Sequence, residues 1–244
     1  MQVNTKMFNQ NLLELSHTVT KIETLAVNGT PISTGTGFFY NMELDTRNVA
    51  LLVTNRHVVE LSHFKDDKCS LRIKFARSTE DGSRASGEGI DVTIPPDRLI
   101  IFYHPEPDVD LAAIPLDPVL NTPQNVGFPM MHVCTLDKDM LPPDHVVSAL
   151  HAGSKTLMIG HPRGLIDEAN NFPIVRSGVL ATPFHADFNG ERQFLVDMAT
   201  FPGSSGSPVL AVFDGIHPTV DGQPIFNGNL KFWLIGILWG CRSI

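Results

Sequence analysis

Short apolar segments separated by turn-forming residues run through most of the chain. Residues 6–16 are an exception, because their apolar side chains lie partly on one helical face and predict a short helix. From Thr18 onward, β-branched residues in short stretches with broken alternation are typical of strands. The pair Asn28-Gly29 marks a tight turn after the first of these strands.

The first half of the chain predicts a small closed β-barrel, because short strands alternate with turns and little helix is indicated. Gly35 and Gly37 fall inside the second strand, which indicates a bulge, a bend or a close backbone approach. Residues 77–88, rich in Ser, Gly, Asp and Glu, are expected to form a solvated loop. The predicted strands are 18–27, 32–40, 49–54, 71–76, 90–94 and 99–103, followed by the apolar run 111–116.

A second set of strands follows a stretch without clear periodicity. Residues 117–152 contain several prolines and are expected to form a linker with irregular surface loops. Two similar β sets joined by a linker imply two barrels with a cleft between them. We therefore divide the chain, taken as one unit, into residues 1–116, 117–152 and 153–244. The strands predicted for the second set are 156–160, 174–181, 193–197, 207–213 and 232–239.

Composition narrows the class of protein. The 244 residues are 42% apolar and 18% charged, which fits a globular protein with a substantial core. The net charge of −8 is spread through the sequence with no basic run, which argues against a nucleic-acid partner. The first ten residues lack the pattern of a signal peptide, and no apolar segment is long enough to span a bilayer. We expect no membrane partner.

The cysteines predict a reducing compartment. Cys69, Cys134 and Cys241 are odd in number, far apart and without metal-ligand spacing. Reduced buried thiols are the simplest interpretation, and they favour the cytoplasm. No pair of histidines has metal-site spacing either, so we expect no metal and no cofactor.

The segment 201–210 carries the candidate chemistry. Gly203 and Gly206 bracket two serines, so the backbone can turn tightly and present a hydroxyl together with backbone N–H groups. Nucleophilic acyl transfer needs an exposed oxygen and donors aimed at the oxyanion that forms. A Gly-x-Ser-Gly loop alone is weak evidence, because a serine nucleophile also needs a histidine base and an orienting carboxylate.

His57 and Asp110 supply the missing groups in the first β set, and Ser205 lies in the second. The order His, Asp, Ser is that of chymotrypsin-type enzymes. The sequence resembles trypsin-like (chymotrypsin-fold) serine proteases, and most of all the HtrA-type peptidase domain. The matching segments extend over about residues 19–240 and are Gly35-Thr-Gly-Phe38, Leu52-Val-Thr-Asn-Arg-His-Val-Val59, Asp108-Val-Asp110-Leu-Ala-Ala-Ile114, Ile159-Gly-His-Pro-Arg-Gly164, Arg176-Ser-Gly-Val-Leu180 and Asp197-Met-Ala-Thr-Phe-Pro-Gly-Ser-Ser-Gly-Ser-Pro208.

The resemblance implies an all-β fold of two six-stranded-type antiparallel barrels with the catalytic cleft between them. It also implies roles at the site: Ser205 as nucleophile, His57 as base, Asp110 as its partner, and the N–H groups of Gly203 and Ser205 as the oxyanion hole. Ser204 has no precedent as a nucleophile in the family. The specificity pocket implied by the resemblance is formed by Ala199, Thr200, Leu238, Trp239 and Gly240.

Three departures from the family pattern matter. Ser204 stands where secreted trypsins have the acid that pairs with a newly cut N-terminus, so activation by that route is not expected. No cysteine lies near His57 or Ser205, so the secreted-type disulfides are absent. The sequence given ends soon after the strand at 234–240, and the family usually adds one more strand and a C-terminal helix. We expect another part of the chain, further sequence or a partner chain to complete the second barrel.

The sequence leaves three functions open. The first is a cytoplasmic serine endopeptidase that cleaves a protein or peptide substrate, and the resemblance extends to regulated proteases of bacterial stress and antiviral defence. The second is a catalytically inactive trypsin-fold binding or scaffold module. The third is an esterase that acts on small acyl groups with the same residues.

Overall fold

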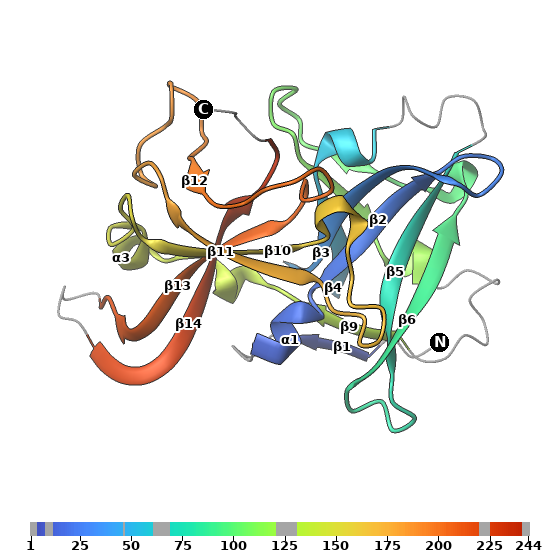
Figure 1. Cartoon of the computed structure of the whole chain (residues 1–244), viewed down its shortest axis with the longest axis horizontal. Coiled ribbons are helices and arrows are strands. Elements are labelled where there is room, and N and C mark those ends of the chain that lie inside the picture. The colour runs from blue at the N-terminus through green and yellow to red at the C-terminus, as the bar shows by residue number, and fades with distance from the viewer. Residues whose placement is uncertain are drawn as a thin grey trace.

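A computed structural model describes residues 4–7, 12–45, 47–60, 69–120, 131–219 and 225–240. Its strands form two β-sheets, and the helices are short (Figure 1). The first sheet contains β1 (Asn4–Met7), β2 (Val19–Leu25), β3 (Pro31–Leu44), β4 (Arg47–Thr54), β5 (Ser70–Ser78), β6 (Ala85–Ile94), β7 (Phe102–Tyr103), β8 (Ala112–Pro115) and β9 (Met131–Thr135). The second contains β10 (Lys155–Gly160), β11 (Ile174–Leu180), β12 (Val196–Asp197), β13 (Pro208–His217) and β14 (Ile225–Ile237). The helices are α1 (Leu12–Ser16), α2 (Asp117–Leu120) and α3 (Asp144–Val147), with 3₁₀ turns η1 (Arg56–Val58), η3 (Pro96–Arg98), η5 (Lys138–Met140) and η6 (Pro162–Gly164).

The first sheet is a barrel whose hydrogen bonding is open between β6 and β7 in the described residues. Its strand order is β1-β9-β5-β2-β3-β4-β8-β7, and β6 pairs with β5. Only η3 and its flanking residues separate β6, which pairs with β5, from β7, which pairs with β8, so the chain itself connects the two strands across this gap. The interruption falls at Pro95 and Pro96, which lack the N–H that a strand would donate.

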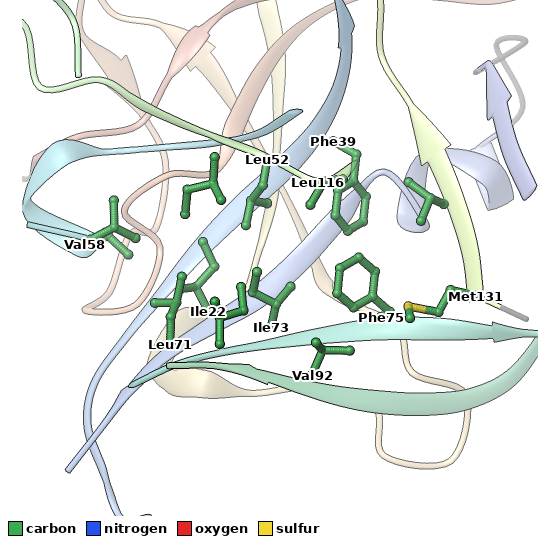
Figure 2. Close-up of a cluster of buried hydrophobic side chains, with 14 of the residues drawn as sticks. Ile22, Phe39, Leu52, Val58, Leu71, Ile73, Phe75, Val92, Leu116 and Met131 are labelled. Carbon is green, nitrogen blue, oxygen red and sulfur yellow. The ribbon is translucent and has the colours of Figure 1, made fainter. Parts of the chain in front are cut away.

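The core of this barrel is built by alternation along its strands. Phe39 on β3 points into it and stacks on Phe75 of β5, with ring centroids 5.5 Å apart (Figure 2). The preceding residue, Phe38, faces the other side of the strand and packs in a second cluster. The labelled members of the barrel core in Figure 2 are Ile22, Phe39, Leu52, Val58, Leu71, Ile73, Phe75, Val92, Leu116 and Met131.

The second cluster joins the two sheets. It contains residues of the first sheet, such as Val19 and Phe38, and residues of the second, such as Ile159 and Leu210. Burying apolar side chains from both sheets in one cluster stabilises their relative position, because separating the sheets would expose that surface to water. The described part of the chain therefore has a shared hydrophobic core at the boundary between its two sheets.

The second sheet has the order β12-β11-β10-β13-β14. The loop around α3 covers part of it through Val146 and Leu150, which pack with Trp233. Within the described residues, β12 and β14 are the two edges of this sheet, so the second barrel is open between them. The predicted all-β fold is confirmed, because the described structure is mostly antiparallel β-sheet, but neither sheet is a fully closed ring of paired strands in the described residues.

Several element predictions need correction. The helix predicted over residues 6–16 is a helix only at Leu12–Ser16, since β1 takes residues 4–7 and residues 8–11 lie outside the described part. The loop predicted at 77–88 is mostly hairpin: β5 and β6 continue to Ser78 and Ala85. The arms of this hairpin are exposed and polar, so their sequence looks like a loop. An ion pair between Arg77 and Glu88 joins them.

The predicted loops at 117–152 contain β9, which lies parallel to β1 and antiparallel to β5. All five of its residues are buried. The sequence Met-His-Val-Cys-Thr has no apolar run and no usable alternation, which explains why the strand was not predicted. The division of the chain at residues 116 and 152 stays a prediction. No helix in the described ranges is both long and apolar enough to cross a membrane.

Candidate active site

His57 and Asp110 meet where two neighbouring strands of the first barrel end. β4 and β8 pair antiparallel with Thr54 opposite Ala112, so the residues after β4 lie beside those before β8. The ring Nδ1 of His57 lies 2.6 Å from Oδ2 of Asp110, and the His57 backbone N–H donates to Oδ1 at 3.0 Å. The side-chain amide of Asn55 donates to the backbone carbonyl of Asp110 at 2.8 Å. This arrangement leaves Nε2 as the ring nitrogen that can face a nucleophile.

The carboxylate of Asp110 is suited to remain charged. Its burial alone would raise its pKa, but the hydrogen bonds from the ring and backbone N–H of His57 lower it, as does the backbone N–H of Arg56. The net result is a pKa below the ordinary value, so Asp110 is ionised at neutral pH. The side chain of Asp110 is 22% exposed and that of His57 is 48% exposed, so the histidine is open to a substrate.

Arg56 holds the turn that leads to Asp110. Its guanidinium donates to the carbonyl oxygens of Pro107 at 3.2 Å and His104 at 3.0 Å. The same group lies 5.1 Å from the ring centroid of Tyr103. Sequence reasoning did not single out Arg56, because its three partners lie on β7 and in the turn that follows it, and no local pattern indicates them.

The nucleophile loop, residues 201–207, places its two serines differently. Ser204 is buried, and its hydroxyl accepts a hydrogen bond from the Phe201 N–H at 3.4 Å. Ser205 is half-buried, and its hydroxyl has no hydrogen-bond partner among the described residues. The geometry therefore gives a structural position to Ser204 and leaves the Ser205 oxygen available.

The backbone N–H groups of this loop also fall into two kinds, those that are hydrogen-bonded within the protein and those that are not. Those of Ser204, Gly206 and Ser207 donate to the carbonyls of Phe201, Leu238 and Ser204. The N–H groups of Gly203 and Ser205 have no acceptor within the part of the chain that the structure describes. Two unused donors beside one hydroxyl are what an oxyanion hole requires.

The orientation of the Gly203 N–H is fixed from outside the loop. The Arg163 N–H donates to the Pro202 carbonyl at 2.6 Å. In a trans peptide the carbonyl and the following N–H point in opposite directions. The bond from Arg163 therefore directs the Gly203 N–H away from η6.

Thr36 ties the loop to the first barrel. Its N–H donates to the Ser205 carbonyl at 2.8 Å, and its hydroxyl donates to the Gly203 carbonyl at 2.8 Å. The same hydroxyl accepts from the His161 N–H at 2.9 Å. The Thr36 carbonyl accepts from the hydroxyl of Thr54, three residues before His57, at 2.7 Å. One residue thus connects the nucleophile loop, η6 and the segment that carries His57.

The positions on either side of Thr36 are glycines because neighbouring side chains approach their backbone closely. A Cβ atom at Gly35 would lie 2.5 Å from Cγ1 of Val58, directly after His57. A Cβ atom at Gly37 would lie 2.7 Å from side-chain carbons of Ile22 and Leu52. Of the options that the sequence left open, a close approach is the one observed.

The expected specificity residues are only partly gathered. Leu238 exchanges backbone hydrogen bonds with Gly206 and Ser207, which places the end of β14 against the nucleophile loop. Trp239 is 48% exposed, and a Cβ atom at Gly240 would have open space. Ala199 is exposed and Thr200 half-buried, in the segment that leads into the loop.

No cluster of three or more His, Cys, Asp or Glu side chains that could hold a metal ion occurs in the described ranges. Cys134 is buried and Cys69 is half-buried, and neither forms a disulfide within the described residues. Cys241 lies outside the described residues.

The chain resembles one protein family over most of its length, and its fold resembles those of solved structures. Residues 35–215 match the family described as trypsin-like peptidase domain. A search of curated proteins finds no match. Among solved structures, the serine endoprotease from Yersinia pestis has a TM-score of 0.45 and 16% identity over 80% of this chain and 50% of its own. A variant of the HtrA-type protease AlgW, solved with a decapeptide, has a TM-score of 0.42 and 13% identity over 89% of this chain and 60% of its own. The chain thus spans between a half and two thirds of the length of these structures.

Proposed function

Because the chain belongs to the trypsin-like peptidase domain family, we propose that it is a serine endopeptidase that acts through His57, Asp110 and Ser205. The observation that supports this most is the pairing of an ionised Asp110 with His57. Thr54 and Thr36 connect the segment of His57 to a loop with two unused N–H donors and a serine hydroxyl that has no hydrogen-bond partner among the described residues. A family fold alone would not require this combination, since a fold does not determine function.

In the proposed reaction, the Ser205 oxygen attacks the scissile carbonyl while Nε2 of His57 takes its proton. Asp110 holds the imidazole with its Nδ1–H toward the carboxylate and stabilises the imidazolium that forms. The tetrahedral oxyanion accepts hydrogen bonds from the N–H groups of Gly203 and Ser205. His57 then gives its proton to the leaving amine, and an acyl-enzyme remains on Ser205. Water, activated by His57, hydrolyses that ester in the same way.

The residue before the scissile bond should be uncharged and small or medium in size. Ala199 and Thr200 offer no charge to a Lys or Arg side chain, and Gly240 leaves room along the wall. Burying a cationic group without a partner costs several kcal/mol. Asp197 is the nearest acid in sequence, but it is exposed on β12 beside Val179. A positional-scanning peptide library checks this prediction, and a clear preference for Lys or Arg would contradict it.

The same residues would serve an esterase, and an open second barrel would suit an inactive binding module. Comparing peptide with ester substrates separates the first alternative, and covalent labelling separates the second. A cytoplasmic location and a role in bacterial stress or antiviral defence stay predictions from the sequence.

A fluorophosphonate probe tests the proposed function. It should label the wild-type protein and Ser204→Ala, and fail to label Ser205→Ala. Removal of the nucleophile should lower peptide cleavage by about four to six orders of magnitude, while the unfolding temperature stays close to that of the wild type. Labelling of Ser205→Ala, or an absence of labelling in the wild type with the fold intact, would reject the proposal.

A further inference from the structure

Two arginines stack on the aromatic ring that opens the nucleophile loop. The guanidinium carbon of Arg163, in η6, lies 4.9 Å from the ring centroid of Phe201. That of Arg176, on β11, lies at the same distance from the same ring. Cations within about 6 Å of an aromatic face are attracted to it, and a guanidinium plane is held in place by such stacking. Segments far apart in sequence thus converge on one ring.

The charges of these arginines are not used elsewhere. Neither guanidinium has an ion-pair partner in the described ranges, although the chain carries 26 acidic and 18 basic residues. The Nε of Arg176 is buried and has no hydrogen-bond acceptor among the described residues. A buried donor without an acceptor is unfavourable, so the protein itself leaves this guanidinium incompletely satisfied. Guanidinium groups bind carboxylates and phosphates, and of these a peptide substrate carries the carboxylates of its Asp and Glu side chains.

The position of the arginines indicates which part of a substrate would reach them. η6 packs against the Gly203 end of the nucleophile loop. A Cβ atom added at Gly203 would lie 2.7 Å from the carbonyl oxygen of His161, the residue before η6. The Gly206 end of the loop bonds to Leu238, the first residue of the proposed pocket wall. The acyl part of a substrate would lie along that wall, so the opposite end of the loop faces the leaving group.

We propose that Arg163, Arg176 and Phe201 form a subsite for an acidic side chain at the first or second residue on the leaving-group side of the scissile bond. This inference rests on the proposed endopeptidase function. The two arginines are specificity-determining residues: they bind the substrate carboxylate and leave the bond-making steps to the triad. Phe201 orients both guanidinium groups before the substrate arrives, which reduces the ordering that binding requires.

Matched peptides test the subsite by cleavage. One series carries Asp or Glu at the first or second leaving-side position, and its partner series carries Asn or Gln. We expect kcat/KM to favour the acidic peptides by about 10-fold in low salt, and the ratio to shrink as ionic strength rises. In Arg163→Gln and Arg176→Gln the ratio should fall toward one. Arg84→Gln, which removes an exposed arginine from the β5–β6 turn, should keep the wild-type ratio of kcat/KM between the two series. Equal cleavage of the two series by the wild type would overturn the inference.

A binding measurement separates this inference from the proposed function. The same peptides, carrying a fluorescent label, are titrated into Ser205→Ala, which should bind without cleaving. Acidic peptides should bind about 10-fold more tightly than their amides, and adding Arg163→Gln or Arg176→Gln should remove the difference. Equal binding overturns the subsite even if the wild type is labelled by the probe. Acid-selective binding by a protein that is not labelled would reject the protease and keep the carboxylate site.

Discussion

Thr36 shows how a residue outside the expected triad positions the site. Its four hydrogen bonds reach Gly203, Ser205, His161 and Thr54, so it fixes the distance between the nucleophile loop and the strand that leads to His57. Its backbone bonds survive any substitution that keeps the strand, but those of its hydroxyl depend on the side chain. The contribution of the Thr36 hydroxyl can therefore be tested separately from that of its backbone.

Thr36→Val removes the hydroxyl while keeping the shape of the side chain. The Gly203 carbonyl and the His161 N–H would both lose a buried partner, which should lower the free energy of unfolding by about 1–3 kcal/mol. A displaced loop should also reduce kcat by roughly 100-fold. Urea unfolding and steady-state kinetics measure the two effects. Thr36→Ser keeps the hydroxyl and should stay close to wild type; if serine and valine variants behave alike, the hydroxyl does not position the loop.

At the scale of elements, the nucleophile loop depends on two glycines with left-handed backbone. Gly203 has φ +90° and Gly206 has φ +88°, a region that other residues rarely adopt. Gly206 is also closed in by the first barrel: its Cβ position would overlap the Thr36 carbonyl oxygen and lie 2.5 Å from the Thr54 hydroxyl. The loop can approach β3 and β4 only because this position lacks a side chain.

Gly206→Ala and Gly153→Ala separate backbone strain from lack of space. Gly153 also has a positive φ, of +91°, but a Cβ atom there would meet nothing within 4 Å. Gly153→Ala should therefore cost only about 1–2 kcal/mol of stability. Gly206→Ala should destabilise by several kcal/mol and abolish probe labelling, because the loop must move away from Thr36. Thermal unfolding and labelling check both variants, and equal losses would show that space at Gly206 is not limiting.

At the scale of the whole molecule, buried and half-buried histidines lie where the two sheets meet. His161 donates its N–H to Thr36 of the first barrel and bonds through Nδ1 to the Leu165 carbonyl, and burial lowers its pKa to about 4. His17 packs edge-on against His132 of β9, and burial with the nearby His132 lowers its pKa to about 4 as well. Both side chains are therefore neutral in the native protein near pH 6.

Stability should therefore fall as the pH drops from about 6.5 to about 4. In this range the unfolded chain binds protons at these histidines and the native state does not, so protonation favours unfolding. Each histidine contributes a slope of at most about 1.4 kcal/mol per pH unit. Urea unfolding at pH 7 and pH 5 measures the loss. His161→Asn should reduce the slope, whereas His185→Asn, at an exposed position, should not. A flat profile in the wild type would contradict the prediction.

The sequence by itself determined the features that depend on neighbours along the chain. The alternating short strands set the all-β fold, and two glycines set the tight turn at Ser205. The expected strands 49–54 and 111–116 place His57 and Asp110 at strand ends, but their selection depended on the order of the three residues and on the family resemblance. The catalytic roles of His57, Asp110 and Ser205, and the pocket residues, stay predictions.

Only the tertiary structure decided the contacts between distant segments. The hydroxyl of Thr36 meets Gly203 across 167 residues and His161 across 125. The meeting of Arg163 and Arg176 on Phe201, and the burial of β9, are likewise invisible in any local pattern. The physical reason is that hydrogen bonding and stacking depend on distance in space, while hydrophobic periodicity reports only which face of an element is buried. Which partner each buried polar group finds is therefore fixed when the two sheets pack together.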